Sequence, residues 1–139
     1  MSDREIMEYD VIIVGAGPAG LSCAIRLKQL KPEMTVAVIE KSGEIGAHIL
    51  SGAVIEPEPL DRLLPGWRDD PPPICVPVER DEIWLLSRDG KRRLPTPPQQ
   101  KNHGNFIVSL GAMCAWLATR AEALEVDLFP GYAASGIRY

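Results

Sequence analysis

The chain has 139 residues, the length of about one domain, and its 45% apolar and 24% charged residues are typical of a globular protein. A net charge of −4 argues against nucleic acid as the main partner. No apolar stretch is long enough for a transmembrane helix, and the opening MSDREIMEYD resembles neither a secretory signal nor a mitochondrial presequence.

The first predicted strand runs straight into a glycine-rich turn. Residues 11–14 are apolar and β-branched, which is typical of a parallel strand buried on both faces. Gly15 allows a sharp turn, Gly17 lets a pyrophosphate approach the backbone, and Gly20 lets the next helix pack close to the strand. We expect that helix over residues 18–30, with its positive N-terminal end facing the phosphates.

A second buried strand, residues 35–39, ends at Glu40, which lies twenty residues after Gly20. A carboxylate there can accept hydrogen bonds from both ribose hydroxyls and repels a 2′-phosphate, so NADP is disfavoured. The full layout predicts dinucleotide binding; a strand–helix–strand turn without a ligand is the alternative. The small-residue segment EIGAHILSGAVI that follows favours FAD over NAD, because a long cofactor needs more backbone contact.

The middle of the chain is rich in proline. Ten of the thirteen prolines lie between Pro57 and Pro98, which excludes a long helix. We expect short strands at 74–78 and 82–87, a turn at 88–91, and a small antiparallel element inserted over or beside the cofactor. Proline-rich disorder is the alternative. The basic triplet at 91–93 is interpreted as a solvated turn rather than an anion site.

The last third of the chain returns to regular patterns. We predict an extended segment at 106–108, an amphipathic helix at 109–124, a strand at 126–129 and a strand-like segment at 132–139. Only three strands are then available for a main parallel sheet. We therefore expect the N-terminal part of a longer protein; a mini-domain completed by dimerisation is the alternative.

Three cysteines, Cys23, Cys75 and Cys114, are odd in number and show no C-x-x-C spacing. No zinc or iron–sulfur site can be built from them alone. Cys23 and Cys114 fall in predicted helices and are expected to be packed. Three unpaired cysteines favour a reducing compartment.

Several motifs, taken together, resemble the electron transfer flavoprotein–ubiquinone oxidoreductase family over nearly the whole chain. They are DVIIVGAGPAGLSCAIRLKQL, VIEKSGEIGAHILSGAVIEP, LPGW, NHGNFIVSLG and ALEVDLFPGYAA. The resemblance implies an α/β, Rossmann-like FAD-binding domain of the glutathione reductase/hydroxylase type, incomplete and with a small inserted β element. Residues 1–56 would form the strand–helix–strand core and flavin segment, 57–104 the inserted element, and 105–139 the helix and third strand.

The resemblance also implies a function for the full-length protein. Electrons would pass from reduced electron transfer flavoprotein to ubiquinone through FAD and a [4Fe–4S] cluster, in a monotopic protein on a membrane surface. We expect the inner face of a bacterial cytoplasmic membrane, or alternatively the mitochondrial inner membrane. Family members are several times longer, and the cluster cysteines lie near the far end of their chains. We therefore expect the cluster only in a missing C-terminal part, and we expect the membrane-binding surface, most of the quinone pocket and the later flavin-contacting motif to be absent as well. No activity is expected from the fragment.

Site residues follow from the same resemblance, and none of them is a catalytic residue or a metal ligand. The pyrophosphate would be held by Gly15, Ala16, Gly17, Ala19 and Gly20. The adenosine ribose would be held by Glu40, with Lys41 near it. The flavin would be lined by Gly46, Ser51 and Gly52. His48 lies in this flavin segment, and a packed or solvent-facing side chain is an alternative of equal weight. Residues 102–105 are either a structural turn or close to the flavin or quinone pocket. A related FAD-dependent reductase or hydroxylase and an inactive nucleotide-binding fragment are the alternative functions.

Overall fold

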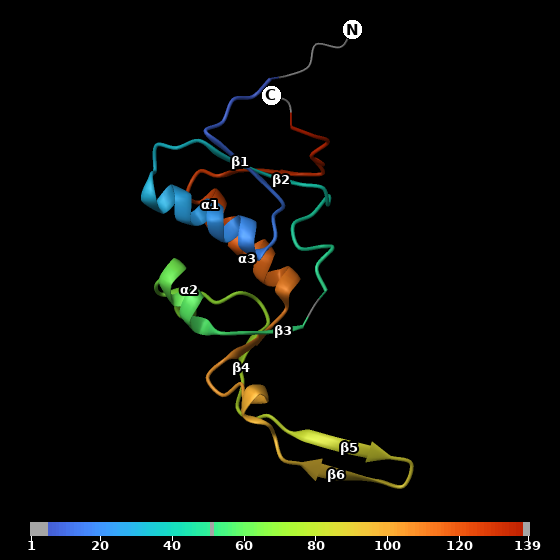
Figure 1. The fold of residues 1–139 in the computed structure, drawn as a ribbon. Helices are drawn as coiled ribbons and strands as arrows, with labels where there is room; N and C mark the ends of the chain where they lie inside the picture. The colour runs from blue at the N-terminus through green and yellow to red at the C-terminus, as the bar shows by residue number, and fades with distance from the viewer. Residues whose placement is uncertain (1–5, 51, 138–139) are drawn as a thin grey trace. The chain divides into compact units, whose positions relative to one another are not determined.

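The computed structural model describes residues 6–50 and 52–137. The chain divides into two compact units, one made of residues 1–51 and 110–139 and the other of residues 52–109. The first unit therefore combines two stretches that are distant in sequence, as the colours of Figure 1 show.

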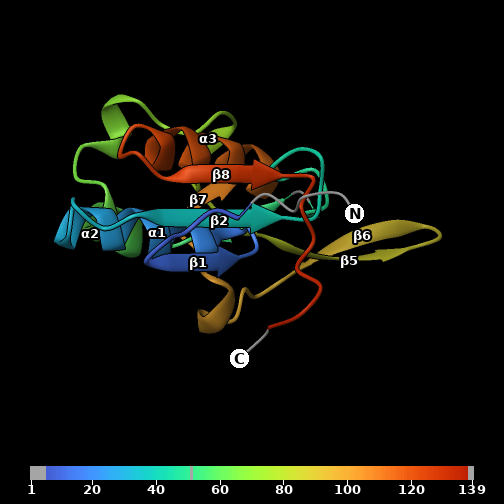
Figure 2. The same cartoon turned by 90° about the horizontal axis from the view of Figure 1, so that it is seen from above.

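The first unit is built on a parallel sheet of three strands, β1 (Val11–Val14), β2 (Val36–Glu40) and β8 (Asp127–Pro130), in the order β1-β2-β8. The register pairs Ile13 with Val38, and Val38 with Leu128. These are the three main-sheet strands that the sequence predicts, within one residue at each end. All three strands point the same way, so their carboxyl ends meet at one edge (Figure 2).

Two helices, α1 (Pro18–Leu30) and α3 (Leu110–Glu122), pack against each other on one face of this sheet (Figures 1 and 2). Proline is acceptable at the first position of α1, and Gly17 takes the N-cap position in an extended conformation. Their apolar faces, the facing residues of β2 and the residue before β8 form the core: Leu21, Ala24, Ile25, Val36, Val38, Cys114, Leu117, Ala121 and Val126. Burial of this stripe, rather than intrinsic propensity, supplies most of the stability of such short helices.

Three sequence predictions in this unit are wrong. Ile12 and Val14 are 55% and 68% exposed, so β1 is buried on one face only, because both helices lie on the other face. Cys23 is exposed on α1, whereas Cys114 is buried as expected. Residues 132–137 form no strand, since the N–H groups of Gly131 and Tyr132 bond to Ser42 and Glu40, which turns the chain out of the ladder.

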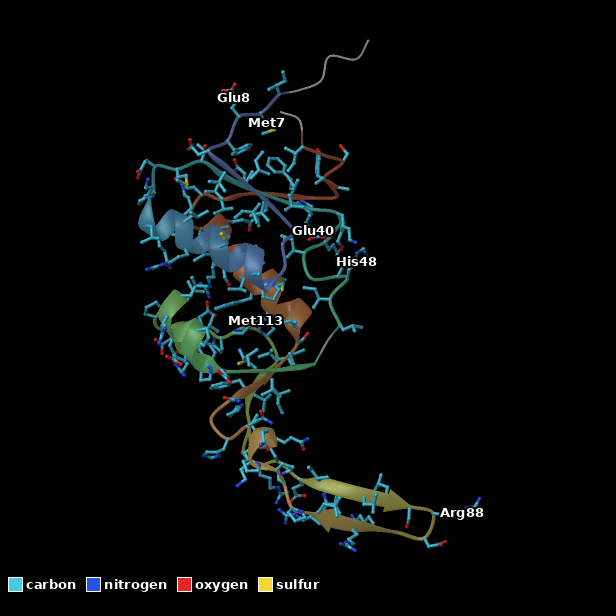
Figure 3. All side chains as sticks on the ribbon, viewed as in Figure 1. Met7, Glu8, Glu40, His48, Arg88 and Met113 are labelled. Carbon is cyan, nitrogen blue, oxygen red and sulfur yellow. The ribbon has the colours of Figure 1, made fainter. Side chains whose placement is uncertain are left out.

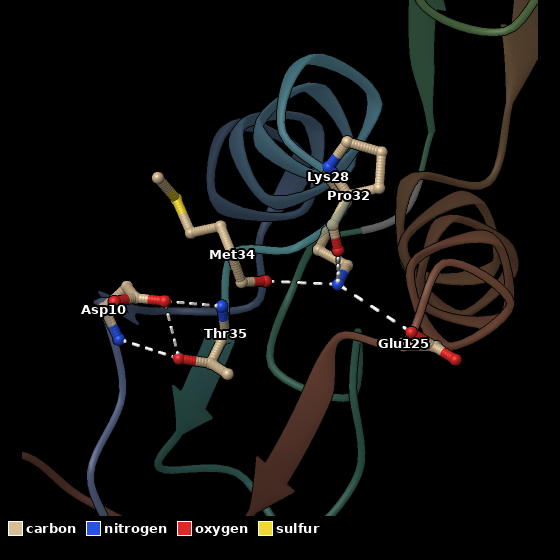
Figure 4. Close-up of polar contacts among 6 residues, drawn as sticks. All are labelled: Asp10, Lys28, Pro32, Met34, Thr35 and Glu125. Atoms are coloured by element: carbon tan, nitrogen blue, oxygen red, sulfur yellow. Dashed lines mark hydrogen bonds and ion pairs between the residues drawn. The ribbon is translucent and has the colours of Figure 1, made fainter.

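Two polar clusters fasten the ends of α1, β1 and β2 (Figure 4). The Lys28 ammonium, on a side chain only 7% exposed, donates to the carbonyls of Pro32 (2.6 Å) and Met34 (3.1 Å), and so holds the turn between α1 and β2. The Asp10 carboxylate accepts from the Thr35 amide (2.8 Å) and hydroxyl (2.9 Å). Both clusters set where β2 begins relative to β1.

The second unit contains an antiparallel sheet of three short strands, β3 (Ala53–Ile55), β7 (Phe106–Val108) and β4 (Cys75–Pro77), in the order β3-β7-β4. Trp67 is buried in the short 3₁₀ turn Trp67–Asp69 and packs edge-on against Phe106, with ring centroids 5.2 Å apart. Asp61 accepts a hydrogen bond from the Trp67 indole (2.7 Å) and pairs with Arg68.

The proline-rich span is ordered, with a second 3₁₀ turn at Pro98–Gln100 and a hairpin of β5 (Ile83–Ser87) and β6 (Gly90–Leu94) joined at Arg88 and Asp89. The strands at 74–78 and 82–87 and the turn are confirmed. A helix that the sequence reading missed, α2 (Pro57–Leu63), lies at its start. Its signal was a proline at the first helical position followed by Glu58 in the first turn.

We predict that Lys28→Met destabilises the chain by about 1–3 kcal/mol, because it leaves two carbonyls without their donor. Glu125 lies 4.0 Å from the same ammonium, but its side chain is 91% exposed. Glu125→Gln should therefore change the free energy of unfolding by less than about 0.5 kcal/mol. Urea unfolding followed by circular dichroism measures both; equal effects of the two variants would contradict the assigned role.

Candidate dinucleotide site

Glu40 connects the glycine loop to the end of the second strand. Its carboxylate accepts a hydrogen bond from the Ala16 amide at Oε2 and from the Ser42 amide at Oε1, both at 2.9 Å. Figure 3 shows Glu40 where β2 ends and the following segment begins. The strand register brings Glu40 beside the loop, because Val14, the last residue of β1, pairs with Ile39. The carboxylate is thus fixed at the carboxyl edge of the sheet.

The same hydrogen bonds keep this carboxylate ionised. The amide of Ser42, and then that of Ala16, lower the pKa of Glu40 below its ordinary value. Partial burial opposes this change, while Lys41 and His48 add smaller favourable charges. Each oxygen retains lone-pair capacity beyond its one amide bond. The Glu40 carboxylate can therefore accept hydrogen bonds from ribose hydroxyls, but its charge would repel a phosphate attached at the ribose 2′ position.

The three glycines of the loop have different structural roles. Gly15 has a φ of +101° and donates its amide to Ile39, which carries the chain sharply off β1. A Cβ on Gly20 would lie 2.0 Å from the Gly15 carbonyl oxygen, so only glycine permits this approach of α1. A Cβ on Gly17 would meet nothing within 4 Å. Gly17 therefore leaves space that the fold itself does not use.

The N-terminal amides of α1 border that space. The first hydrogen bond within the helix runs from Leu21 to the Gly17 carbonyl (3.0 Å). The preceding amides, including those of Ala19 and Gly20, have no partner within the helix. Their dipoles point outward at the end where α1 is positive, which is the arrangement that suits a phosphate anion.

A cleft of about 300 Å³ lies at this edge of the sheet. Its walls are Val14 and Gly15 from the end of β1, residues 39–41 from the end of β2, and residues 132–134 beyond β8. The segment 132–134 is a part of the site that sequence reasoning missed. Its signal was position, because it directly follows the carboxyl end of the third parallel strand, where ligands of such sheets bind.

An aromatic row holds that third wall in place. Phe129 packs edge-on against Tyr132 (5.8 Å between centroids) and against Tyr9 (6.2 Å), whose hydroxyl donates to Asp127 at 2.9 Å. The Tyr132 amide also donates to the Glu40 carbonyl at 2.9 Å. Residues 132–134 are thus held both by the packing against β8 and by a hydrogen bond to the backbone of Glu40, on the opposite side of the cleft.

The structure brings four of the predicted residues together: Gly15, Ala16, Glu40 and Lys41 share the cleft or its hydrogen bonds. Gly46 has a different visible role, because a Cβ there would lie 2.3 Å from the Gly111 carbonyl oxygen at the start of α3. His48 is exposed, as Figure 3 shows. Gly52 belongs to the second unit, and Ser51 lies outside the described residues. Their contacts with a flavin stay predictions.

Within residues 6–50 and 52–137, no group of three or more histidine, cysteine or acidic side chains could hold a metal ion. Burial raises the pKa of the Cys114 thiol to about 11, which keeps it protonated. In the same described part of the chain, no helix is long and apolar enough to span a membrane.

Comparisons with known proteins agree with this geometry. Residues 2–57 match the model of the Thi4 family. Over 140 residues the chain is 51% identical to the mitochondrial electron transfer flavoprotein–ubiquinone oxidoreductase of Oryza sativa, covering 98% of this chain and 24% of that protein. It is 48% identical over 146 residues to the probable electron transfer flavoprotein–ubiquinone oxidoreductase of Acinetobacter baylyi, covering 99% and 26%. The family resemblance drawn from the sequence is confirmed, and the chain spans about a quarter of these relatives' length.

A solved structure supports the fold. CtdE in complex with FAD superimposes with a TM-score of 0.57 at 20% identity, over 90% of this chain and 30% of that one. At that identity the likeness concerns the fold alone. The Rossmann-type α/β fold expected from the sequence is confirmed.

We predict that Glu40→Gln lowers the free energy of unfolding at pH 7 by about 1–3 kcal/mol, because an amide NH₂ group would replace one of the two acceptors. A pKa lowered on folding stabilises the native state above the ordinary value of 4.5, and that contribution is lost as pH falls through the folded value. The stability gap between wild type and variant should therefore be constant above about pH 5 and shrink below about pH 4.5. The control is Glu33→Gln on an exposed residue; a pH-independent gap would contradict the assignment.

Proposed function

We propose that this chain binds the ADP half of FAD at the carboxyl edge of its parallel sheet. The observation that carries the proposal is the Glu40 carboxylate, fixed by the amides of Ala16 and Ser42 beside the cleft. It would accept the ribose hydroxyls, while the open space at Gly17 and the N-terminal amides of α1 would receive the pyrophosphate. The residues present therefore fit the nucleotide.

FAD is favoured over NADP and NAD on two separate grounds. The Glu40 charge repels a 2′-phosphate, which argues against NADP. The relatives are named as flavoprotein-linked oxidoreductases, and CtdE, of like fold, is in complex with FAD. When bound, the flavin would supply the redox chemistry, and these residues would orient and anchor its nucleotide half.

For the full-length protein we propose electron transfer from electron transfer flavoprotein to ubiquinone, as the names of the relatives indicate. The 139 residues would contribute nucleotide binding and no catalytic group of their own. The [4Fe–4S] cluster that the family resemblance implies would be held by residues beyond these 139, because Cys23, Cys75 and Cys114 form no ligand cluster in the described structure. A flavin-dependent reductase or hydroxylase of the same fold is the second candidate, since CtdE shows that a protein of this fold can hold FAD.

Although the family resemblance implies a membrane-binding surface outside this chain, we propose that the β5–β6 hairpin contacts a membrane surface. Leu85 and Leu86 are 57% and 73% exposed, and Trp84 is 42% exposed. Each of the three pairs across the hairpin with a cation, because Trp84, Leu85 and Leu86 face Arg93, Arg92 and Lys91. Exposed apolar side chains interleaved with cations are typical of segments that enter the interface of an anionic bilayer. The surface would be a bacterial cytoplasmic membrane or the mitochondrial inner membrane.

We predict that Gly17→Val abolishes FAD binding while the chain stays folded. The added side chain would fill the pyrophosphate space, and the backbone at Gly17 (φ −78°, ψ −179°) accepts valine with a loss of about 1 kcal/mol in N-cap preference. Gly20→Ala is the contrasting variant, since its Cβ would clash with Gly15 at 2.0 Å and unfold the chain. Flavin fluorescence titration measures the FAD affinity of each variant, and thermal unfolding shows whether the variant is folded. If Gly17→Val binds FAD with wild-type affinity, the proposed site is wrong.

We predict that Leu86→Ser weakens binding to vesicles of phosphatidylcholine and phosphatidylglycerol by about ten-fold or more, the effect of withdrawing one buried leucine. Leu50→Ser is the matched control, because Leu50 is 91% exposed in the first unit. Co-sedimentation with vesicles measures both. Equal binding by the two variants and wild type would show that the hairpin does not contact the membrane.

A further inference from the structure

A second cleft, of about 410 Å³, lies within the second unit at the base of the β5–β6 hairpin. It is lined by Arg80, Asp81, Arg93, Thr96, Lys101 and His103. Three of these six residues are cations and one is a carboxylate. None of these residues lines the first cleft.

The two negative side chains near this cleft are already engaged. The Asp81 carboxylate accepts from the Asn102 amide (2.7 Å) and from the Asn102 side-chain amide (2.9 Å), so both its oxygens hold the loop that carries His103. Glu82 lies 3.5 Å from Arg80 Nε and 3.5 Å from Arg93 Nη2 and accepts the Trp84 indole N–H at 3.0 Å. Asp81 and Glu82 thus position the groups around them.

Donors remain after these contacts are made. Glu82 forms an ion pair with one nitrogen of each arginine, Arg80 and Arg93. Because a guanidinium carries five N–H groups, each arginine keeps further donors. Lys101 is exposed and adds an ammonium with three donors. Thr96 is not a donor here, because its hydroxyl donates to the Asp81 carbonyl at 3.2 Å. With Glu82 counted, the cleft and its rim carry one net positive charge. The two planar guanidinium groups and the ammonium can donate hydrogen bonds to the oxygens of a phosphate.

The cleft continues the hairpin face proposed to meet the membrane. Arg93 pairs with Trp84 and Lys91 with Leu86, so these four residues share one face, and Lys91 lies over the Trp84 ring at 5.0 Å. With the Trp84–Leu86 face laid along the interface, the charged tip residues stay in the polar layer and Arg93 would lie at headgroup depth.

We propose that the cleft of Arg80, Arg93, Lys101 and His103 binds a phosphate group, which on a membrane is the phosphodiester of an anionic lipid headgroup. The lipid part rests on the proposed membrane contact of the hairpin, whereas the phosphate site does not. Trp84 and Leu86 of β5 would enter the interface, the charged tip that Figure 3 marks at Arg88 would stay among the headgroups, and the cleft would supply headgroup recognition at the base of the hairpin.

The test uses the whole chain with Arg93→Gln and Lys101→Gln, and Lys31→Gln as a matched loss of an exposed charge in the first unit. On vesicles of phosphatidylcholine and phosphatidylglycerol in equal parts, each cleft variant should bind roughly five-fold more weakly. Lys31→Gln should lose less than about two-fold, and Arg93→Lys should restore most of the binding. Thermal unfolding checks that every variant is folded.

A second arm titrates glycerol 3-phosphate while the amide resonances of residues 101–105 are followed by NMR. Saturable shifts in wild type that vanish in Lys101→Gln support the phosphate site. If these shifts occur but vesicle binding is equal in all variants, the cleft takes a soluble phosphate and the lipid part is overturned. If wild type binds no vesicle yet shows the shifts, the membrane contact of the hairpin fails while the phosphate site stands. If glycerol 3-phosphate causes no shifts in wild type, or if Lys31→Gln loses the shifts as fully as Lys101→Gln does, the cleft proposal is overturned.

Discussion

One interaction holds the carboxyl edge of the parallel sheet together: the pair of hydrogen bonds that the Glu40 carboxylate accepts from the amides of Ala16 and Ser42. It joins the glycine loop after β1 to the turn after β2, and the neighbouring backbone bonds of Tyr132 and Gly131 add the segment after β8. Three strand ends are thereby gathered at one edge. A carboxylate that is held ionised there organises the loop and remains available as an acceptor, so the group with this structural role is also the one that we propose to recognise the ribose.

Much of the first unit could be predicted from sequence because its signals are local. The apolar run of β1, the glycine spacing and the helical repeat of α1 each constrain only neighbouring residues. The role of residues 132–134 was missed because it comes from the backbone bonds of Gly131 and Tyr132 to distant residues. The exposed face of β1 was missed because a run such as VIIV does not report how many layers cover it.

The second unit was harder for a physical reason. Its prolines exclude long elements but do not say which short ones form, so α2 was overlooked while the hairpin turn at Arg88 and Asp89 was found. The prediction that the basic triplet forms a solvated turn is wrong, because residues 91–93 lie in β6 and pair with residues 84–86 of β5. Only the strand register, which sets Arg93 opposite Trp84 and beside Glu82, indicates that part of this charge belongs to a cleft.

The most direct test of the central claim is an NMR titration of the ¹⁵N-labelled chain with FAD and, separately, with NADP. We expect saturable shifts with FAD at the amides of residues 15–17, at Ser42 and at residues 132–134, and no such saturation with NADP, because the Glu40 carboxylate repels the 2′-phosphate. FAD shifts confined to other residues, or equal responses to the two nucleotides, would contradict the account.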